Sequence, residues 1–236
     1  MANLLRFLLA LAGLPFTWAI SRAFADVVLL VPSPADSIFP AGALAGIAGF
    51  ALCLVLLVVL PAPVRLYVLG HELTHAVWGI LFGARVSRLK VGPKGGCVTL
   101  SKSNVLITLA PYFFPFYTML VALAALMTQA FVSPLPCPWA WLFAVGFTWC
   151  FHCCFTVRSL MQTQPDVEEY GRLFSYVFIW IFNVAGAAAW VVCTTEVRWC
   201  DLGRVVAHRT VSVYAAIGGA FAWIYESLRT LPVLQG

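Results

Sequence analysis

The sequence predicts an all-α polytopic membrane protein with about six to seven membrane helices and one β-hairpin after an HExxH-bearing helix. Two observations predict this fold. Of the 236 residues, 62% are hydrophobic and only 10% are charged, whereas soluble domains are about 25% charged. In addition, residues 38–64, 104–157 and 173–195 contain no Asp, Glu, Lys or Arg. We therefore expect a single integral membrane domain, residues 1–236, surrounded by the lipid bilayer.

The uncharged segments set the expected helices. A membrane crossing needs about 20 apolar residues, so the first and third segments fit one helix each. The middle segment fits two helices, separated by the three prolines of SPLPCP at 133–138, because proline interrupts a helix. Together with the remaining apolar stretches, the pattern predicts helices over 4–24, 38–60, 64–82, 104–131, 139–161, 171–195 and 207–230.

A different pattern occupies ARVSRLKVGPKGGCVTLSKS, residues 84–103. Apolar and polar residues alternate on both sides of GPKGG, which is typical of two strands joined by a turn. We expect a β-hairpin at the membrane surface or partly embedded in it. The hairpin has five basic residues and no acidic one: Arg85, Arg88, Lys90, Lys94 and Lys102. The positive-inside rule then places it in the cytoplasm. If the second expected helix runs inward, either the helix at 64–82 is short or re-entrant, or one of the expected helices is wrong.

The segment LGHELTHAVWG, residues 69–79, has the pattern of a zinc site. Helical residues four apart share a face, so His71 and His75 can direct imidazole nitrogens at one point, as two ligands of tetrahedral zinc do. Glu72 can accept a proton from water at that zinc without binding the metal. An ionisable residue inside an apolar segment is costly and indicates a function. We therefore expect Zn²⁺ held by His71 and His75, with Glu72 as the catalytic base.

The third zinc ligand is open between two residues on side-chain chemistry alone, since a catalytic zinc generally has three protein ligands. Asp166 lies in QTQPDVEEYGRLFS at an apparent helix start, where an N-cap role is the alternative. Glu168 is a nearby carboxylate that can substitute for it. His152 lies inside its expected helix, about 13 Å along the helix axis from the C-terminal end. A carboxylate near the membrane face is therefore the easier partner for a zinc ion near that face.

Taken together, these motifs resemble the site-2 protease family of intramembrane zinc metalloproteases, in particular its compact bacterial branch without PDZ or CBS domains. HELTHAVWGILFGARV is similar to the family's HExxHA followed by xxxGxxV, and QPDVEEYGRLFS resembles its later acidic motif. The resemblance covers about residues 60–185 and implies Asp166 as the third ligand. The family's Asn-Pro-x-x-x-Leu-Asp-Gly is reduced here to Pro165-Asp166, and LAPYFFP (109–115) replaces its common Gly-Pro-x-x-Asn.

The resemblance implies a zinc metalloendopeptidase of the bacterial inner (cytoplasmic) membrane that hydrolyses peptide bonds of membrane-protein or peptide substrates. The hairpin edge can bind such a substrate as an added strand, or the hairpin only sets the topology through its charges. The alternative function is an inactive pseudoprotease or membrane zinc-binding scaffold; the reduced acidic motif favours it, and the intact Glu72 argues against it. No basic run is interleaved with aromatic residues, so we expect no nucleic-acid partner.

Overall fold

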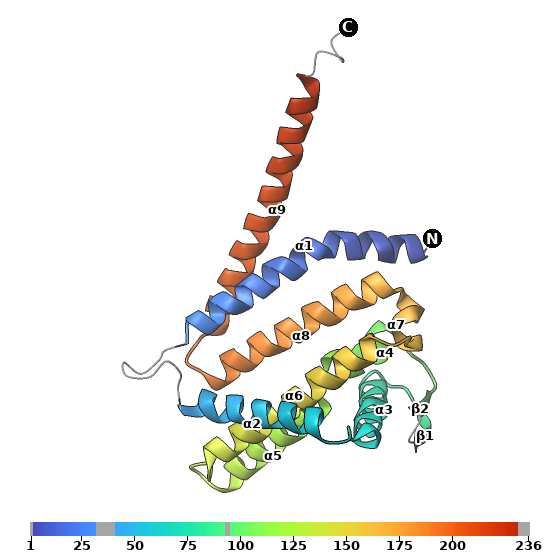
Figure 1. Ribbon diagram of the computed structural model, residues 1–236, viewed down its shortest axis with the longest axis vertical. Helices are drawn as coiled ribbons and strands as arrows, with labels where there is room; N and C mark the ends of the chain where they lie inside the picture. Colours follow the sequence, from blue (N-terminus) through green and yellow to red (C-terminus); the bar gives the residue numbers. More distant parts are fainter. Residues whose placement is uncertain (1, 32–40, 93–94, 231–236) are drawn as a thin grey trace. The chain divides into compact units, whose positions relative to one another are not determined.

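The computed structural model describes residues 2–31, 41–92 and 95–230 (Figure 1). The described chain is mostly helical and contains one two-stranded antiparallel sheet. Its elements are α1 (Ala2–Leu29), α2 (Ala41–Val59), α3 (Val64–Leu81), β1 (Val86–Gly92), β2 (Gly95–Leu100), α4 (Val105–Phe113), α5 (Phe116–Phe131), α6 (Pro138–Leu160), α7 (Pro165–Tyr170), α8 (Arg172–Thr194) and α9 (Trp199–Arg229).

Five of the described helices are long and apolar enough to cross a membrane, namely α1, α2, α6, α8 and α9. The bent pair of α4 and α5 makes a sixth span if the two count as one. Within the described ranges α3 does not qualify, because the polar side chains of the HExxH motif interrupt its apolar sequence. The predicted fold class, an all-α polytopic membrane protein with a β-hairpin, is confirmed.

The chain groups into two compact units. One consists of Met1–Pro32 with Tyr176–Gly236, and the other of Ser33–Ser175. The second unit contains all residues of the predicted zinc site. It also contains most of the segment of about residues 60–185 that resembles the protease family. A single domain over residues 1–236 stays a prediction.

In the first unit, polar side chains of the membrane helices are paired with one another. The Arg209 guanidinium of α9 donates two hydrogen bonds to the Asp26 carboxylate of α1, one of them 2.8 Å from Nη2 to Oδ1. The Tyr214 hydroxyl donates to a carbonyl of α1 at 2.6 Å. Because unpaired polar groups are costly in a bilayer, these contacts stabilise the packing of α1 against α9.

In the second unit, α2 packs against α6 at backbone distance. A Cβ added at Gly146 would lie 1.9 Å from the carbonyl oxygen of Gly46, and one added at Gly49 would lie 2.0 Å from that of Phe143. Only glycine allows such an approach, which is how small residues drive helix association in membranes. This contact anchors α6, the helix that leads directly into α7.

The prediction of one helix over 104–131 was wrong. α4 ends at Phe113, α5 begins at Phe116, and the two helices are bent by 78° at the break. Pro115 explains the bend, because a proline disfavours helical backbone at the preceding residue. Phe114 accordingly has extended angles, φ −99° and ψ 106°. The bend makes α4 a separate short helix packed against α3 and α7.

Two further helix boundaries differ from the prediction. α9 begins at Trp199 rather than at residue 207. Residues Pro165–Tyr170 form the separate helix α7 before α8, and Gly171, with φ +88°, divides the two. The N-cap of α7 is Gln164. Asp166 is therefore not the N-cap, and its carboxylate points elsewhere.

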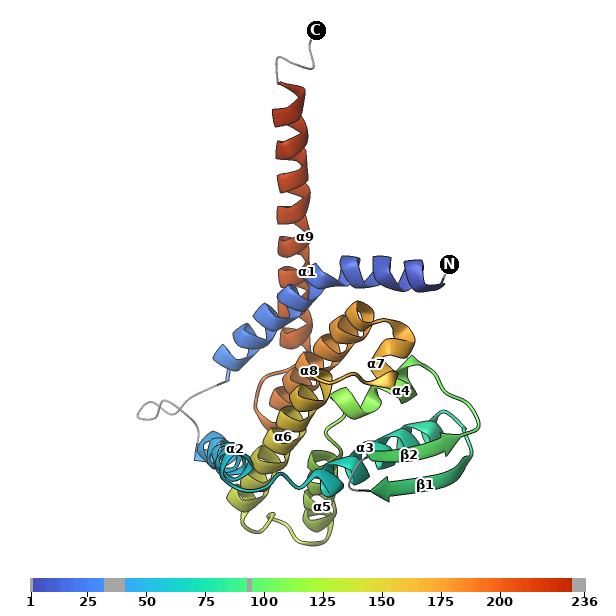
Figure 2. The ribbon, with the colours of Figure 1, turned by 45° about the vertical axis from the view of Figure 1, so that its right-hand side comes forward.

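The hairpin predicted within 84–103 is confirmed. β1 and β2 pair antiparallel with Gly92 opposite Gly95, while Pro93 and Lys94 of the expected turn lie outside the described residues. Leu89 pairs with Val98, and Arg88 and Lys90 pair with Thr99 and Cys97. Since alternate residues of a strand face opposite sides, the basic side chains lie on one face and the apolar ones on the other. The hairpin lies alongside α3 (Figure 2).

Candidate metal centre

One buried face of helix α3 carries residues of the candidate site. The helix starts after Pro61 and Pro63, which separate it from α2. Its buried residues include Val68, Glu72, His75 and Gly79, which recur every three or four positions and so share one face. The histidine pair and the acid of the HExxH motif are thereby held on the side of α3 that contacts the hairpin and α4.

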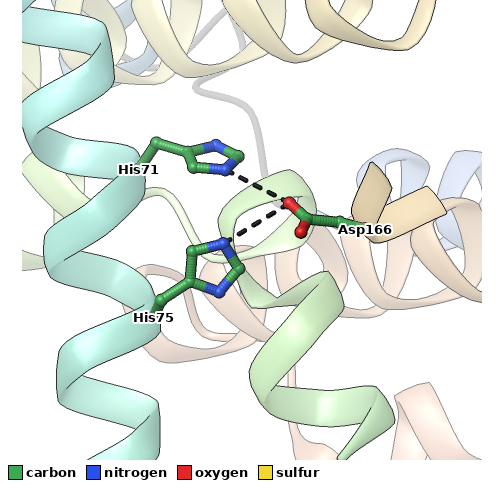
Figure 3. A group of neighbouring side chains, drawn as sticks. All are labelled: His71, His75 and Asp166. Atoms are coloured by element: carbon green, nitrogen blue, oxygen red, sulfur yellow. Dashed lines mark ion pairs between the residues drawn. The ribbon is translucent and has the colours of Figure 1, made fainter. Parts of the chain in front are cut away.

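His71, His75 and Asp166 meet at one point (Figure 3). The Oδ2 atom of Asp166 lies 3.3 Å from Nε2 of His71 and 3.4 Å from Nε2 of His75. A tetrahedral zinc with ligand bonds of 2.0–2.2 Å places its ligand atoms about 3.3–3.6 Å apart. Two imidazole nitrogens and one carboxylate oxygen are also the donors that catalytic zinc prefers. The three side chains therefore fit a zinc ion, with one position left open.

Asp166 reaches the histidines because of the short helix α7. Pro165 occupies the first turn, where its missing N–H is no loss. Val167 of α7 is buried, and its carbonyl oxygen accepts a 2.9 Å hydrogen bond from the Ser175 hydroxyl. These contacts fix α7 against the rest of the unit, with Asp166 directed at α3.

Each of the three side chains has a second partner. The Nδ1 atom of His75 donates to the Ile107 carbonyl oxygen at 2.9 Å, which leaves its Nε2 free to bind a metal. The Tyr67 hydroxyl lies 3.3 Å from Nδ1 of His71. The Tyr112 hydroxyl donates to Oδ2 of Asp166 at 3.1 Å. Such outer contacts orient metal ligands, and none of these three partners was predicted from the sequence.

The charge state of Asp166 suits a metal ligand. Burial by itself raises the pKa of a carboxyl group, but the hydrogen bonds and positive charge of His71 and His75 outweigh burial. The pKa of Asp166 is therefore held well below its usual range. The carboxylate stays ionised at neutral pH, which is the form that binds metal ions.

Glu72 lies beside the three candidate ligands and does not belong to their group. Among the described residues, the group that can hold a metal ion contains His71, His75 and Asp166 only. Glu72 is only 7% exposed, and Val98 of β2 lines the same cavity. A Cβ added at Gly96 of β2 would lie 2.5 Å from Cγ of Glu72. Strand β2 of the hairpin therefore lies directly against the Glu72 side chain.

A cavity of about 660 Å³ opens onto this site. Its walls include His71, Glu72, His75 and Asp166. β2 contributes Gly95, Gly96, Cys97, Val98 and Leu100, and the described part of β1 contributes none. Because consecutive residues of a strand face opposite sides, the run from Gly95 to Val98 shows that an edge of β2, rather than one of its faces, borders the cavity.

The other two ligand candidates lie apart from this point. His152 is buried inside α6 and is not a member of the metal-binding group found in the described residues. Glu168 is exposed on α7, and it does not belong to that group either. The structure thus places Asp166 with His71 and His75.

Comparisons with models of known protein families, with curated proteins and with solved structures found no match. A function for this chain therefore has to be inferred from its own residues. The relevant features are the His-His-Asp group, the adjacent Glu72 and the cavity bordered by a strand edge.

Proposed function

We propose that this protein is an intramembrane zinc metalloendopeptidase that hydrolyses peptide bonds of membrane-protein substrates. The convergence of His71, His75 and Asp166 on one point, with Glu72 on the same cavity, carries the proposal. The resemblance of the HExxH segment to the site-2 protease family supports the reaction class. The five or six membrane-spanning helices favour a substrate that is itself in the bilayer.

The chain's residues divide the chemistry between them. When bound by His71, His75 and Asp166, zinc would supply a Lewis acid and lower the pKa of a water in its open position to about 7. Glu72 accepts a proton from the attacking water and later donates it to the departing amine. Burial of Glu72 beside β2 keeps its carboxylate aimed at the cavity throughout.

The edge of β2 provides a means of presenting the substrate. A peptide bond inside a helix is protected by the hydrogen bonds of that helix, so cleavage requires an extended chain. A strand edge binds an extended chain through main-chain hydrogen bonds, and the edge of β2 borders the cavity that contains Glu72. The substrate would therefore form a third strand on the edge of β2 that faces away from β1.

Metal content tests the zinc site. We expect about one zinc per chain in the purified wild-type protein. We expect almost none in His71→Ala, His75→Ala or Asp166→Ala, because each variant removes one of the three candidate ligands found among the described residues. Elemental analysis of detergent-purified protein measures the content directly.

Two variants serve as controls in that experiment. His152→Ala and Glu168→Ala remove the other candidate ligands and should keep the full zinc content, because neither residue belongs to the group. Loss of zinc from His152→Ala alone would replace Asp166 by His152 as the third ligand. Full zinc in the His71→Ala, His75→Ala double variant would refute the site.

The native thiol of Cys97 tests the orientation of the hairpin. Cys97 is exposed on β2, and the neighbouring basic residues predict that it faces the cytoplasm. A membrane-impermeant thiol reagent should therefore label Cys97 in inside-out vesicles and not in intact cells, as read by peptide mass spectrometry. Cys97→Ser identifies the labelled peptide, and labelling of Cys97 from outside intact cells would invert the topology.

A further inference from the structure

Tyr112 of α4 lies at the metal centre although it belongs to no sequence motif of the site. Its side chain is fully buried, with 0% exposed. Its hydroxyl donates to Oδ2 of Asp166 at 3.1 Å, the same oxygen that faces Nε2 of both histidines. A carboxylate oxygen has two lone pairs, so Oδ2 can accept this hydrogen bond and bind a metal at the same time.

The ring of Tyr112 also contacts a second ligand residue. It meets the imidazole of His71 edge to face, with 5.4 Å between the ring centroids and an interplanar angle of 87°. The same short helix supplies the Ile107 carbonyl that accepts from His75. α4 therefore contacts all three candidate ligands, and two of these contacts come from Tyr112.

Asp166 depends on such a contact because of where it lies. α7 has six residues, too few for a helix to be stable without tertiary contacts. The Asp166 carboxylate must lie next to two histidines that are more than ninety positions earlier in the sequence. Tyr112 is placed beside it by the bend between α4 and α5, which frees α4 to pack on α3 and α7.

We propose that Tyr112 is a positioning residue of this site, whose phenolic hydrogen holds the Asp166 carboxylate between the imidazoles of His71 and His75. The role rests on the proposed zinc site. It also gives a purpose to LAPYFFP, the segment in which this chain departs from the protease family it resembles. Loss of an outer partner of a metal ligand typically weakens metal binding by about 10- to 100-fold.

The test compares Tyr112→Phe with Tyr117→Phe. Both variants remove one phenolic hydroxyl, but that of Tyr117 donates to the Leu66 carbonyl at 2.6 Å rather than to a candidate ligand. The zinc Kd is measured by competition with a chelator in detergent-purified protein. We expect Tyr112→Phe to raise the Kd by about 10- to 100-fold and Tyr117→Phe to leave it nearly unchanged. The visible spectrum of the Co²⁺-loaded protein should change in Tyr112→Phe only.

A double-variant cycle shows whether Tyr112 acts through Asp166. In the Asp166→Ala variant, whose weak residual binding is titrated at high zinc concentration, Tyr112→Phe should raise the Kd no further, because the carboxylate that Tyr112 holds is gone. Equal Kd values for the wild type and Tyr112→Phe overturn the positioning role while the zinc site stands. A metal-free Tm that falls in Tyr112→Phe while its Co²⁺ spectrum stays that of the wild type shows a packing role instead, which also overturns it. A wild-type protein that binds no zinc removes the proposed function, and this role with it.

Discussion

Replacement of Glu72 by Gln should abolish cleavage while the protein keeps its zinc. Gln has nearly the same shape as Glu but cannot accept the proton of the attacking water, and loss of a general base typically costs about 10²- to 10⁴-fold in rate. Zinc should remain because Glu72 is outside the group of three ligand residues. The rate is measured on transmembrane-segment peptides reconstituted in detergent with the purified protein, with products identified by mass spectrometry.

Glu168→Gln is the matched control for this experiment. It makes the same chemical change on an exposed residue that does not line the cavity, so it should leave the rate unchanged. Zinc bound by the wild type without any cleavage that depends on Glu72 would favour the alternative, a membrane zinc-binding scaffold. Cleavage that persists in Glu72→Gln would assign the base to another residue.

Local patterns in the sequence were sufficient to predict most of the fold. The hairpin follows from alternation around a glycine-rich turn, and the pairing of Leu89 with Val98 is the register that this alternation requires. The placement of His71 and His75 on one face follows from helical periodicity alone. Both features depend on residues close together in the chain, which is why the sequence sufficed.

The bend at Phe114 was missed for a different reason. Pro111 and Pro115 both lie in the expected helix 104–131. Pro111 is accommodated inside α4, whereas Pro115 breaks the helix. A proline in an apolar segment is compatible with either outcome in a membrane, because neighbouring groups can satisfy the freed backbone. Packing of α4 against α3 and α7 decides between them, and the sequence does not display that packing.

The candidate site was only partly predictable, because some of its contacts join residues far apart in the sequence. The HExxH motif is local, but the meeting of Tyr112 with Asp166 joins residues 54 positions apart. Side-chain chemistry left Asp166 and His152 open as the third ligand, and two arguments favoured Asp166: its expected place near the membrane face and the resemblance to a known family. The close contact between Gly96 and Glu72 also depends on how the hairpin folds over α3.

Gly96→Ala should reduce cleavage strongly without removing zinc or unfolding the protein. The added Cβ would lie 2.5 Å from Cγ and 2.7 Å from Oε1 of Glu72, and 2.7 Å from Cγ1 of Val68, so these side chains or the strand must move. The end of a Glu side chain moves more easily than a paired strand, and therefore the expected change is a displaced Glu72 carboxylate. A misplacement of about 1 Å in a reacting group can cost about 10²-fold in rate.

Three measurements separate this displacement from a general disturbance of the hairpin. The zinc content of Gly96→Ala should equal that of the wild type, because the three atoms nearest to the new methyl group belong to Glu72 and Val68 rather than to a candidate ligand, and the Tm should show that the protein stays folded. Gly219→Ala on α9 is the control, since a Cβ there meets nothing within 4 Å, and it should keep full activity. If Gly96→Ala cleaves as fast as the wild type, the hairpin does not position the base, and Glu72 must be aligned by contacts within α3.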